Sequence, residues 1–225
     1  MATSSSQWES NSINRDILDK ADSVTLVLGP DKHELLAPAN ILTRSSDFFK
    51  TALKKEWLEG QTRTITMPDE DPETIAEYLS IIRCGRLPVR FEKFEELPNL
   101  NTSSLSSLYI FYSKAYILGS RLLDDKLKRG AIGKIHALFK HYNWAASWDD
   151  KDMSGHEFVN TIYDGTLESD PARRLLVDMY TQSPRDLNIQ HHPEFLLALA
   201  QALSKSVVAT KVQRARVSDI AYYLR

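Results

Sequence analysis

The stretch SDFFKTALKKEWLEGQTRTITMPDEDPETIAEYLSIIRCG, residues 46–85, carries the clearest local signals in the chain. Ser46 can cap a helix, and Asp47 would lie in the positive first turn of that helix. The apolar residues that follow recur at i, i+1, i+4 and i+5, and form one face: Phe48, Phe49, Ala52 and Leu53. The stretch therefore begins with an amphipathic helix.

A short strand and a second helix follow in the same stretch. Thr64–Met67 alternates polar and apolar residues, which predicts a half-buried strand. Asp71 and Pro72 start a helix, because Asp accepts from free amides and Pro has no amide to leave unpaired. The apolar stripe of this helix is Ile75, Tyr78, Leu79 and Ile82, and Gly85 is the expected left-handed stop.

A hairpin precedes this stretch. Val24, Leu26 and Leu28 alternate with their neighbours as in a strand, and residues 33–37 would return across the turn Gly-Pro-Asp-Lys. A short helix is expected over residues 40–45. Short strands with paired helices predict an α+β fold.

Five helical stripes follow residues 86–100, a charged connection with two prolines. They cover about residues 105–119, 123–138, 157–163, 171–180 and 193–203. Gly130 and Gly133 cost the second of these helices about 1 kcal/mol each relative to Ala, so close helix packing is expected there.

Composition and charge limit the classes of function that are expected for this chain. The chain has 225 residues, 42% of them apolar, which is enough for a packed core. A net charge of −2 gives no general electrostatic case for nucleic acid or a membrane as partner. One cysteine, no apolar run of roughly 18 residues and no signal-peptide pattern predict an intracellular protein of the cytoplasm or nucleus.

Several motifs in this order resemble a BTB/POZ domain, and the acidic form of one of them resembles the fungal members. They are Asp22–Gly29, Pro30–Lys32, Leu42, Ser46–Phe49, Glu59–Gln61, Ile65–Pro68, Asp69–Pro72 and Cys84–Pro88. The resemblance covers roughly residues 19–138. Val159–Thr166 and Arg173–Asp178 also resemble the helical tail of those fungal proteins.

The resemblance implies a BTB/POZ fold, a small sheet flanked by paired helices, followed by an all-α C-terminal extension. The expected organisation is a flexible N-terminus with a possible short helix over residues 1–18, the BTB/POZ domain over 19–138, a linker over 139–155 and the extension over 156–225. The members of this family are protein-interaction modules.

No catalytic, cofactor or metal site is expected. Cys84 stands beside Arg83 and Arg86 without a motif-placed base, so a buried structural thiol is the preferred interpretation. His191 and His192 lack further ligands at zinc spacing and are interpreted as a loop or helix start. The acids of residues 69–71 are explained by capping and solvation.

The basic residues near the C-terminus are the remaining candidate for nucleic-acid binding. They are Lys205, Lys211, Arg214 and Arg216. No aromatic residues are interleaved with them for base stacking, so a solvated helix face is preferred.

Trp57 and Glu59 are the candidate binding residues. In BTB adaptors that bind cullins, a hydrophobic residue, any residue and then Glu stand at this place. An aromatic anchor with one charge is also the composition of an interface hot spot. The alternative is that Trp57 folds back on Phe49 and Leu53 while Glu59 caps the next turn.

Two further expectations follow from the resemblance. A helix turn with Ile13, Ile17 and Leu18 on one face would contribute to a homodimer, or would pack on its own domain. Pro38 and Ala39 stand where many members have a basic residue, so the basic partner of Asp22 in the pocket of repressor members is missing. Co-repressor binding through such a pocket is therefore not expected.

These observations predict a non-enzymatic protein-interaction module with protein partners. The first hypothesis is a substrate adaptor that binds the cullin of a ubiquitin ligase through Trp57 and Glu59. The alternative is a homodimerising scaffold or regulatory protein with no ubiquitin-ligase role, in which Trp57 is packed inside.

Overall fold

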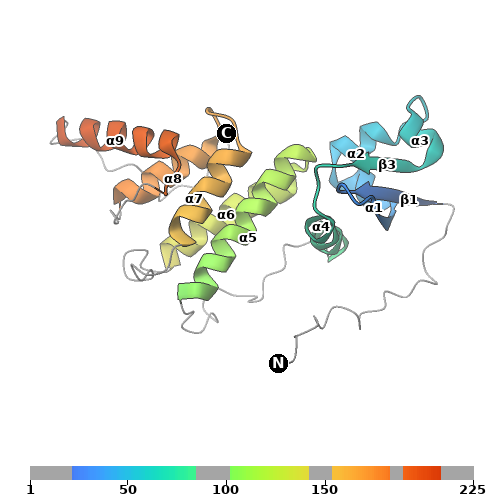
Figure 1. Ribbon diagram of the computed structural model, residues 1–225, viewed down its shortest axis with the longest axis horizontal. Coiled ribbons are helices and arrows are strands. Elements are labelled where there is room, and N and C mark those ends of the chain that lie inside the picture. Colours follow the sequence, from blue (N-terminus) through green and yellow to red (C-terminus); the bar gives the residue numbers. More distant parts are fainter. Residues whose placement is uncertain (1–21, 85–101, 142–153, 183–189, 209–225) are drawn as a thin grey trace. The chain divides into compact units, whose positions relative to one another are not determined.

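The computed structural model describes residues 22–84, 102–141, 154–182 and 190–208. These residues belong to two compact units, one ending at Gly85 and the other beginning at Arg86 (Figure 1). The expected dimer contacts Ile13, Ile17 and Leu18 lie outside the described residues.

The first unit contains a three-stranded mixed sheet. Its strands are β1 (Ser23–Leu28), β2 (His33–Pro38) and β3 (Thr64–Met67), in the order β2-β1-β3. β1 and β2 form the predicted antiparallel hairpin, and Gly29 in the turn has a φ of +66°. β3 runs parallel to β1, with Thr64 opposite Thr25. The α+β class predicted from the sequence is confirmed.

Four helices accompany this sheet: α1 (Ala39–Ser45), α2 (Asp47–Ala52), α3 (Leu58–Thr62) and α4 (Pro72–Cys84). The predicted caps are confirmed. The Phe49 amide donates to the Ser46 hydroxyl oxygen over 3.2 Å, and the Thr74 amide donates to the Asp71 carboxylate over 2.8 Å. The short-range sequence signals therefore set where α2 and α4 begin.

The core of the first unit lies between the sheet and the helices. Val24, Leu26 and Leu28 are fully buried, as their alternation predicts, and Ile65 and Met67 of β3 are buried as well. Phe49 and Tyr78 stack in this core with their ring centroids 6.4 Å apart. The buried face of α4 differs in one position from the predicted apolar stripe. Ile81 is buried, whereas Leu79, which was predicted to be part of the stripe, is only half-buried.

The second unit is helical in its described residues. Its helices are α5 (Thr102–Arg121), α6 (Asp125–His141), α7 (Ser154–Gly165), α8 (Pro171–Gln182) and α9 (Pro193–Val208). α5 packs against both α6 and α7, and α8 packs against α6, α7 and α9. Tyr109 of α5 meets Phe158 of α7 with ring centroids 4.9 Å apart. The domain limits expected at residues 138 and 156 stay predictions.

Close helix packing occurs at Gly119 and Gly165, which the sequence analysis did not single out. A Cβ on Gly119 would lie 2.8 Å from the Lys128 amide nitrogen, and one on Gly165 would lie 2.7 Å from Ile117 Cγ1. These contacts bring α5 against α6 and α7. A Cβ on Gly133 would meet nothing within 4 Å, so the expectation of close packing at Gly133 was wrong.

Candidate protein-interaction surface

The Trp57 loop, which we define as Lys54–Gly60, contains most of the connection between α2 and α3 together with the first turn of α3, and hydrogen bonds hold its backbone. The Trp57 amide donates to the Lys54 carbonyl over 3.0 Å, and the Trp57 carbonyl accepts from the Gln61 amide over 3.1 Å. The Gln61 side-chain amide also donates to the Lys55 carbonyl over 3.1 Å. These bonds hold both sides of the loop to the start of α3.

Gly60 allows the two sides of the loop to touch. A Cβ at this position would lie 2.6 Å from the Lys54 carbonyl carbon and 2.9 Å from that of Leu53. Real Cβ atoms do not approach backbone atoms so closely. A glycine is therefore required at this point if the loop is to keep this shape.

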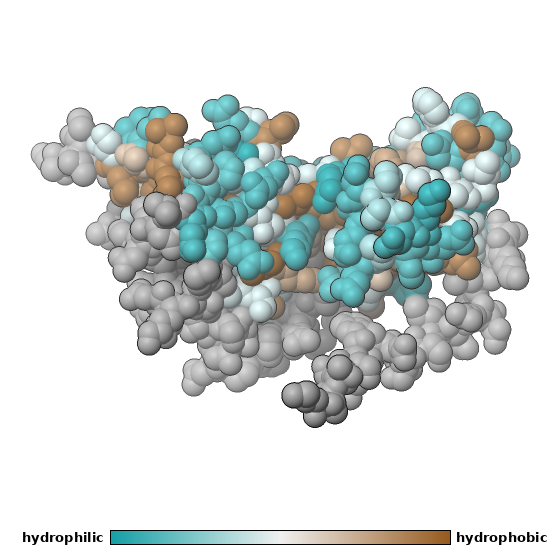
Figure 2. All heavy atoms as spheres, in the orientation of Figure 1, coloured by the Kyte–Doolittle hydropathy of each residue, from teal (hydrophilic) through white to brown (hydrophobic). Residues whose placement is uncertain are grey.

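Trp57 and Leu58 project from the closed loop into solvent. The Trp57 side chain is 55% exposed and that of Leu58 is 69% exposed, and Figure 2 shows hydrophobic surface over α3. Trp57 is therefore not folded into the core beneath Phe49 and Leu53. A Trp can bury up to about 250 Å², so covering its exposed half would contribute about 3 kcal/mol at ~25 cal/mol per Å².

The charges around these two side chains balance. Lys54, Lys55 and Glu56 are exposed, and Glu59 is half-buried in the first turn of α3. An apolar centre with a polar, mixed-charge border is the usual anatomy of a protein interface. The predicted residues Trp57 and Glu59 are thus brought together at the start of α3, and Leu58 joins them as an apolar residue that the sequence pattern missed.

Arg63 orients the far end of α3. It ends the helix with a φ of +56°, in the left-handed region, and its guanidinium donates to the Asp22 carboxylate over 3.2 Å. Asp22 therefore has a basic partner in Arg63, which lies at a different place in the chain from Pro38 and Ala39. β1 begins directly after Asp22, and β3 begins directly after Arg63. Because the two strands pair in parallel, the Asp22 and Arg63 side chains lie close together.

Arg173 organises the helical unit. Its buried guanidinium donates to Thr166 Oγ1 over 3.0 Å, to Glu194 over 2.5 Å, and to the carbonyls of Tyr163 and Thr166. The guanidinium carbon also lies 4.5 Å from the centre of the Tyr163 ring. Arg173 therefore holds α7, α8 and α9 together. The sequence did not predict this structural role, because two adjacent arginines, Arg173 and Arg174, usually indicate an exposed surface.

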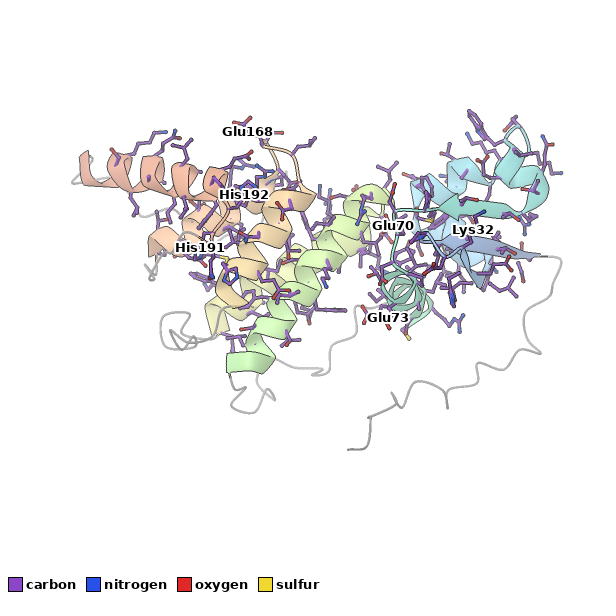
Figure 3. The ribbon with its side chains drawn as sticks, in the orientation of Figure 1. Lys32, Glu70, Glu73, Glu168, His191 and His192 are labelled. Carbon is purple, nitrogen blue, oxygen red and sulfur yellow. The ribbon has the colours of Figure 1, made fainter. Side chains whose placement is uncertain are left out.

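His191 and His192 precede α9, as Figure 3 shows. The Glu194 amide donates to His192 Nδ1 over 3.2 Å, which confirms the predicted helix-start role. Asn160 of α7 clamps the segment by donating to the Gln190 carbonyl over 2.8 Å and accepting from the His192 amide over 2.7 Å. The buried His191 ring stacks on Phe195 at 5.8 Å. Both histidines therefore act in packing and capping.

Two expectations about polar residues were wrong. Cys84 is exposed at the last position of α4 rather than buried. Glu70, which was assigned to a solvated acidic surface, is buried. Lys205 is exposed on α9 as predicted, whereas Lys211, Arg214 and Arg216 lie outside the described residues.

Among the described residues, no three His, Cys, Asp or Glu side chains are grouped so that they could hold a metal ion. No helix in the same residues is both long and apolar enough to cross a membrane. Compared with known proteins, the chain matches no protein-family model and no curated protein.

Proposed function

We propose that this chain is a non-enzymatic protein-interaction protein that docks a partner on the Trp57 loop. The observation that carries the proposal is the exposure of Trp57 and Leu58 on a loop whose backbone is closed by hydrogen bonds and by Gly60. A preformed loop loses little conformational entropy on binding, so burial of its apolar side chains stabilises the complex with little offset.

We further propose that the first unit has a BTB/POZ fold. The motifs from Asp22 to Pro88 support this assignment, and a small mixed sheet accompanied by α1–α4 is compatible with it. The helices that follow residue 101 would then hold a second protein. The assignment rests on the resemblance of the motifs, and the binding surface rests on the exposed side chains.

The partner that we propose is the N-terminal domain of a cullin, so that the chain acts as a substrate adaptor of a ubiquitin ligase. Trp57 would enter an apolar pocket of the cullin, Leu58 would cover the border of that pocket, and Glu59 would pair with a basic side chain. The alternative is self-association through Ile13, Ile17 and Leu18, with no ubiquitin-ligase role. An exposed Trp57 favours the adaptor over this alternative, which has Trp57 packed inside.

Size-exclusion chromatography with light scattering tests the proposal, on the chain alone and mixed with a cullin N-terminal domain. The expected result is a stoichiometric complex. Trp57→Ala should weaken it by at least about 30-fold, since an interface hot spot contributes about 2 kcal/mol or more. Glu59→Ala and Leu58→Ala should each weaken it less.

Leu167→Ala is the matched control, because Leu167 is 80% exposed but belongs to the helical unit. It should leave the complex unchanged, and circular dichroism checks that every variant stays folded. Absence of a complex at tens of micromolar, where binding is weaker than about −7 kcal/mol, would overturn the adaptor assignment. A mass of two chains in the unmixed sample would then support the homodimer.

A further inference from the structure

A groove runs between α8 and α9 in the helical unit. It encloses about 520 Å³, and its apolar lining comes from Val177 of α8 with Leu197 and Ala198 of α9. The Leu197 side chain is 61% exposed, and Figure 2 shows hydrophobic surface over α9. A groove of this size can bury several aliphatic side chains of a partner.

The groove is short. Its lining on α9 follows the spacing i, i+3, i+4 and i+7 of one helix face: Glu194, Leu197, Ala198 and Gln201. At 1.5 Å per residue this face is about 10 Å long, which is the length of about three residues of extended chain. The groove therefore suits a short segment of a partner protein.

The connection between α7 and α8 forms one edge of the groove, and its backbone is held in place. The Asp170 amide donates to the Leu167 carbonyl over 2.9 Å. The Arg173 guanidinium donates to the Thr166 carbonyl and, over 3.0 Å, to Thr166 Oγ1. Glu168 lies on this connection, as Figure 3 shows, and lines the groove. A partner therefore meets a preformed edge, which reduces the entropy lost on binding.

Glu168 gives this edge a negative charge. Its side chain is exposed, and within the described part of the chain its carboxylate forms no ion pair or hydrogen bond. The other charged residues of the lining are Asp178, Glu194, Arg173 and Arg174. Arg173 is bonded to Glu194, and Arg174 stands four residues before Asp178 on α8, at the spacing of helical ion pairs. The lining therefore has three acids against two bases, and the excess negative charge is that of Glu168.

We infer that the α8–α9 groove docks a short segment of a partner protein in which an aliphatic side chain stands next to a lysine or arginine. The aliphatic side chain would be buried against Leu197 and Val177, and the basic side chain would pair with Glu168. The negative edge attracts a basic segment and repels an acidic one. This inference rests on the proposed function, because an adaptor must hold a second protein besides the cullin.

Fluorescence anisotropy of labelled peptides with the full chain tests the inference without a cullin. The probe is Gly-Ser-Lys-Leu-Leu-Lys-Gly-Ser. One comparison peptide has glutamate in place of both lysines, and another has alanine in place of both leucines. The probe should bind with a dissociation constant of about 100 μM or tighter, and each comparison peptide at least about ten-fold more weakly.

Variants of the groove separate its two contacts. Leu197→Ala should weaken the probe at least about five-fold, whereas Leu36→Ala is the matched control, because Leu36 is 62% exposed but belongs to the first unit. Glu168→Lys should reverse the preference, so that the glutamate peptide binds more tightly than the lysine peptide. Glu157→Lys makes the same charge change at an exposed position of α7 and should leave the preference unchanged. Circular dichroism checks that every variant stays folded.

Equal binding of the three peptides, or no binding of the probe at about 1 mM, would overturn the inference. So would unchanged binding by the Leu197→Ala variant. A mass of two chains that falls to one chain in Leu197→Ala would show that a second copy fills the groove, and would overturn it too. Trp57→Ala should weaken the cullin complex but leave peptide binding unchanged, so failure of this inference and failure of the proposed function are distinguishable.

Discussion

Gly60 lies against the backbone of Lys54, so closely that a Cβ on Gly60 would stand 2.6 Å from the Lys54 carbonyl carbon. This contact closes the Trp57 loop. Together with the bond from the Trp57 amide to the Lys54 carbonyl, it fixes the direction in which Trp57 and Leu58 leave the surface. The shape of the candidate interface therefore depends on a residue that contributes no side chain to it.

Gly60→Ala is expected to lower the free energy of unfolding by about 1–3 kcal/mol, because the added methyl group forces the two backbones apart. Gly133→Ala is the matched control. Its Cβ would meet nothing within 4 Å, so the better helix propensity of Ala should stabilise the protein by up to about 1 kcal/mol. Urea denaturation measures both variants, and effects of the same sign would contradict the close contact at Gly60.

The parts of the fold that the sequence predicts are those set by neighbouring residues. Ser46 and Asp71 cap the helices they were expected to cap, and the alternation of β1 places Val24 and Leu26 in the core. Cys84 was mispredicted because α4 continues past its last buried residue, Ile82, into solvent.

The parts that could not be predicted depend on contacts between residues distant in sequence. Arg63 meets Asp22 because β3 pairs with β1, and local patterns carry no signal for that pairing. For the candidate site, the family pattern pointed to Trp57 and Glu59 but could not decide whether Trp57 is buried. The structure decides this, because the Trp57 side chain is 55% exposed.

Arg173→Ala is expected to lower the free energy of unfolding by about 2–4 kcal/mol. The loss leaves the carbonyls of Tyr163 and Thr166 without a buried donor, and an unsatisfied buried group costs about 1–3 kcal/mol. Arg173→Lys should restore little, because an ammonium cannot reproduce the planar fork.

The neighbouring exposed Arg174→Ala serves as the control, with an expected effect within about 0.5 kcal/mol. Urea denaturation compares the three proteins. Equal stability of the Arg173→Ala and Arg174→Ala variants would show that the buried guanidinium does not hold the three helices together.

Asp170 connects α8 with α5 and, through an ion pair of 3.5 Å with Lys128, with α6, so its replacement should be costly. Its carboxylate caps α8 by accepting from the Ala172 amide over 2.9 Å, and it accepts from the Tyr116 hydroxyl over 2.6 Å. Asp170→Ala should cost about 2–4 kcal/mol, the sum of a lost cap and an unpaired hydroxyl. Tyr116→Phe removes only the second bond and should cost less. Thermal unfolding would rank the variants, and the reverse order would contradict the capping role.

Stability should fall in alkali because of buried tyrosines. Burial raises the pKa of Tyr163 from 10.0 to about 12. The nearby Arg173 guanidinium opposes this rise in the pKa, and the Glu194 carboxylate adds to it. Burial and the bond to Asp170 also raise the pKa of Tyr116. The unfolded chain therefore releases these protons first, near pH 10, while the folded protein still holds them.

Since the folded state binds more protons between pH 10 and 12, the free energy of unfolding should fall over this range. The slope is at most about 1.4 kcal/mol per pH unit for each such tyrosine. Below pH 10 both states are protonated, and the contribution is fully present. Tyr163→Phe should reduce the slope, because it removes one titrating group. Urea denaturation at several pH values, with tyrosinate absorbance of the folded protein, measures both quantities. An unchanged slope in the variant would show that Tyr163 ionises at the same pH in both states.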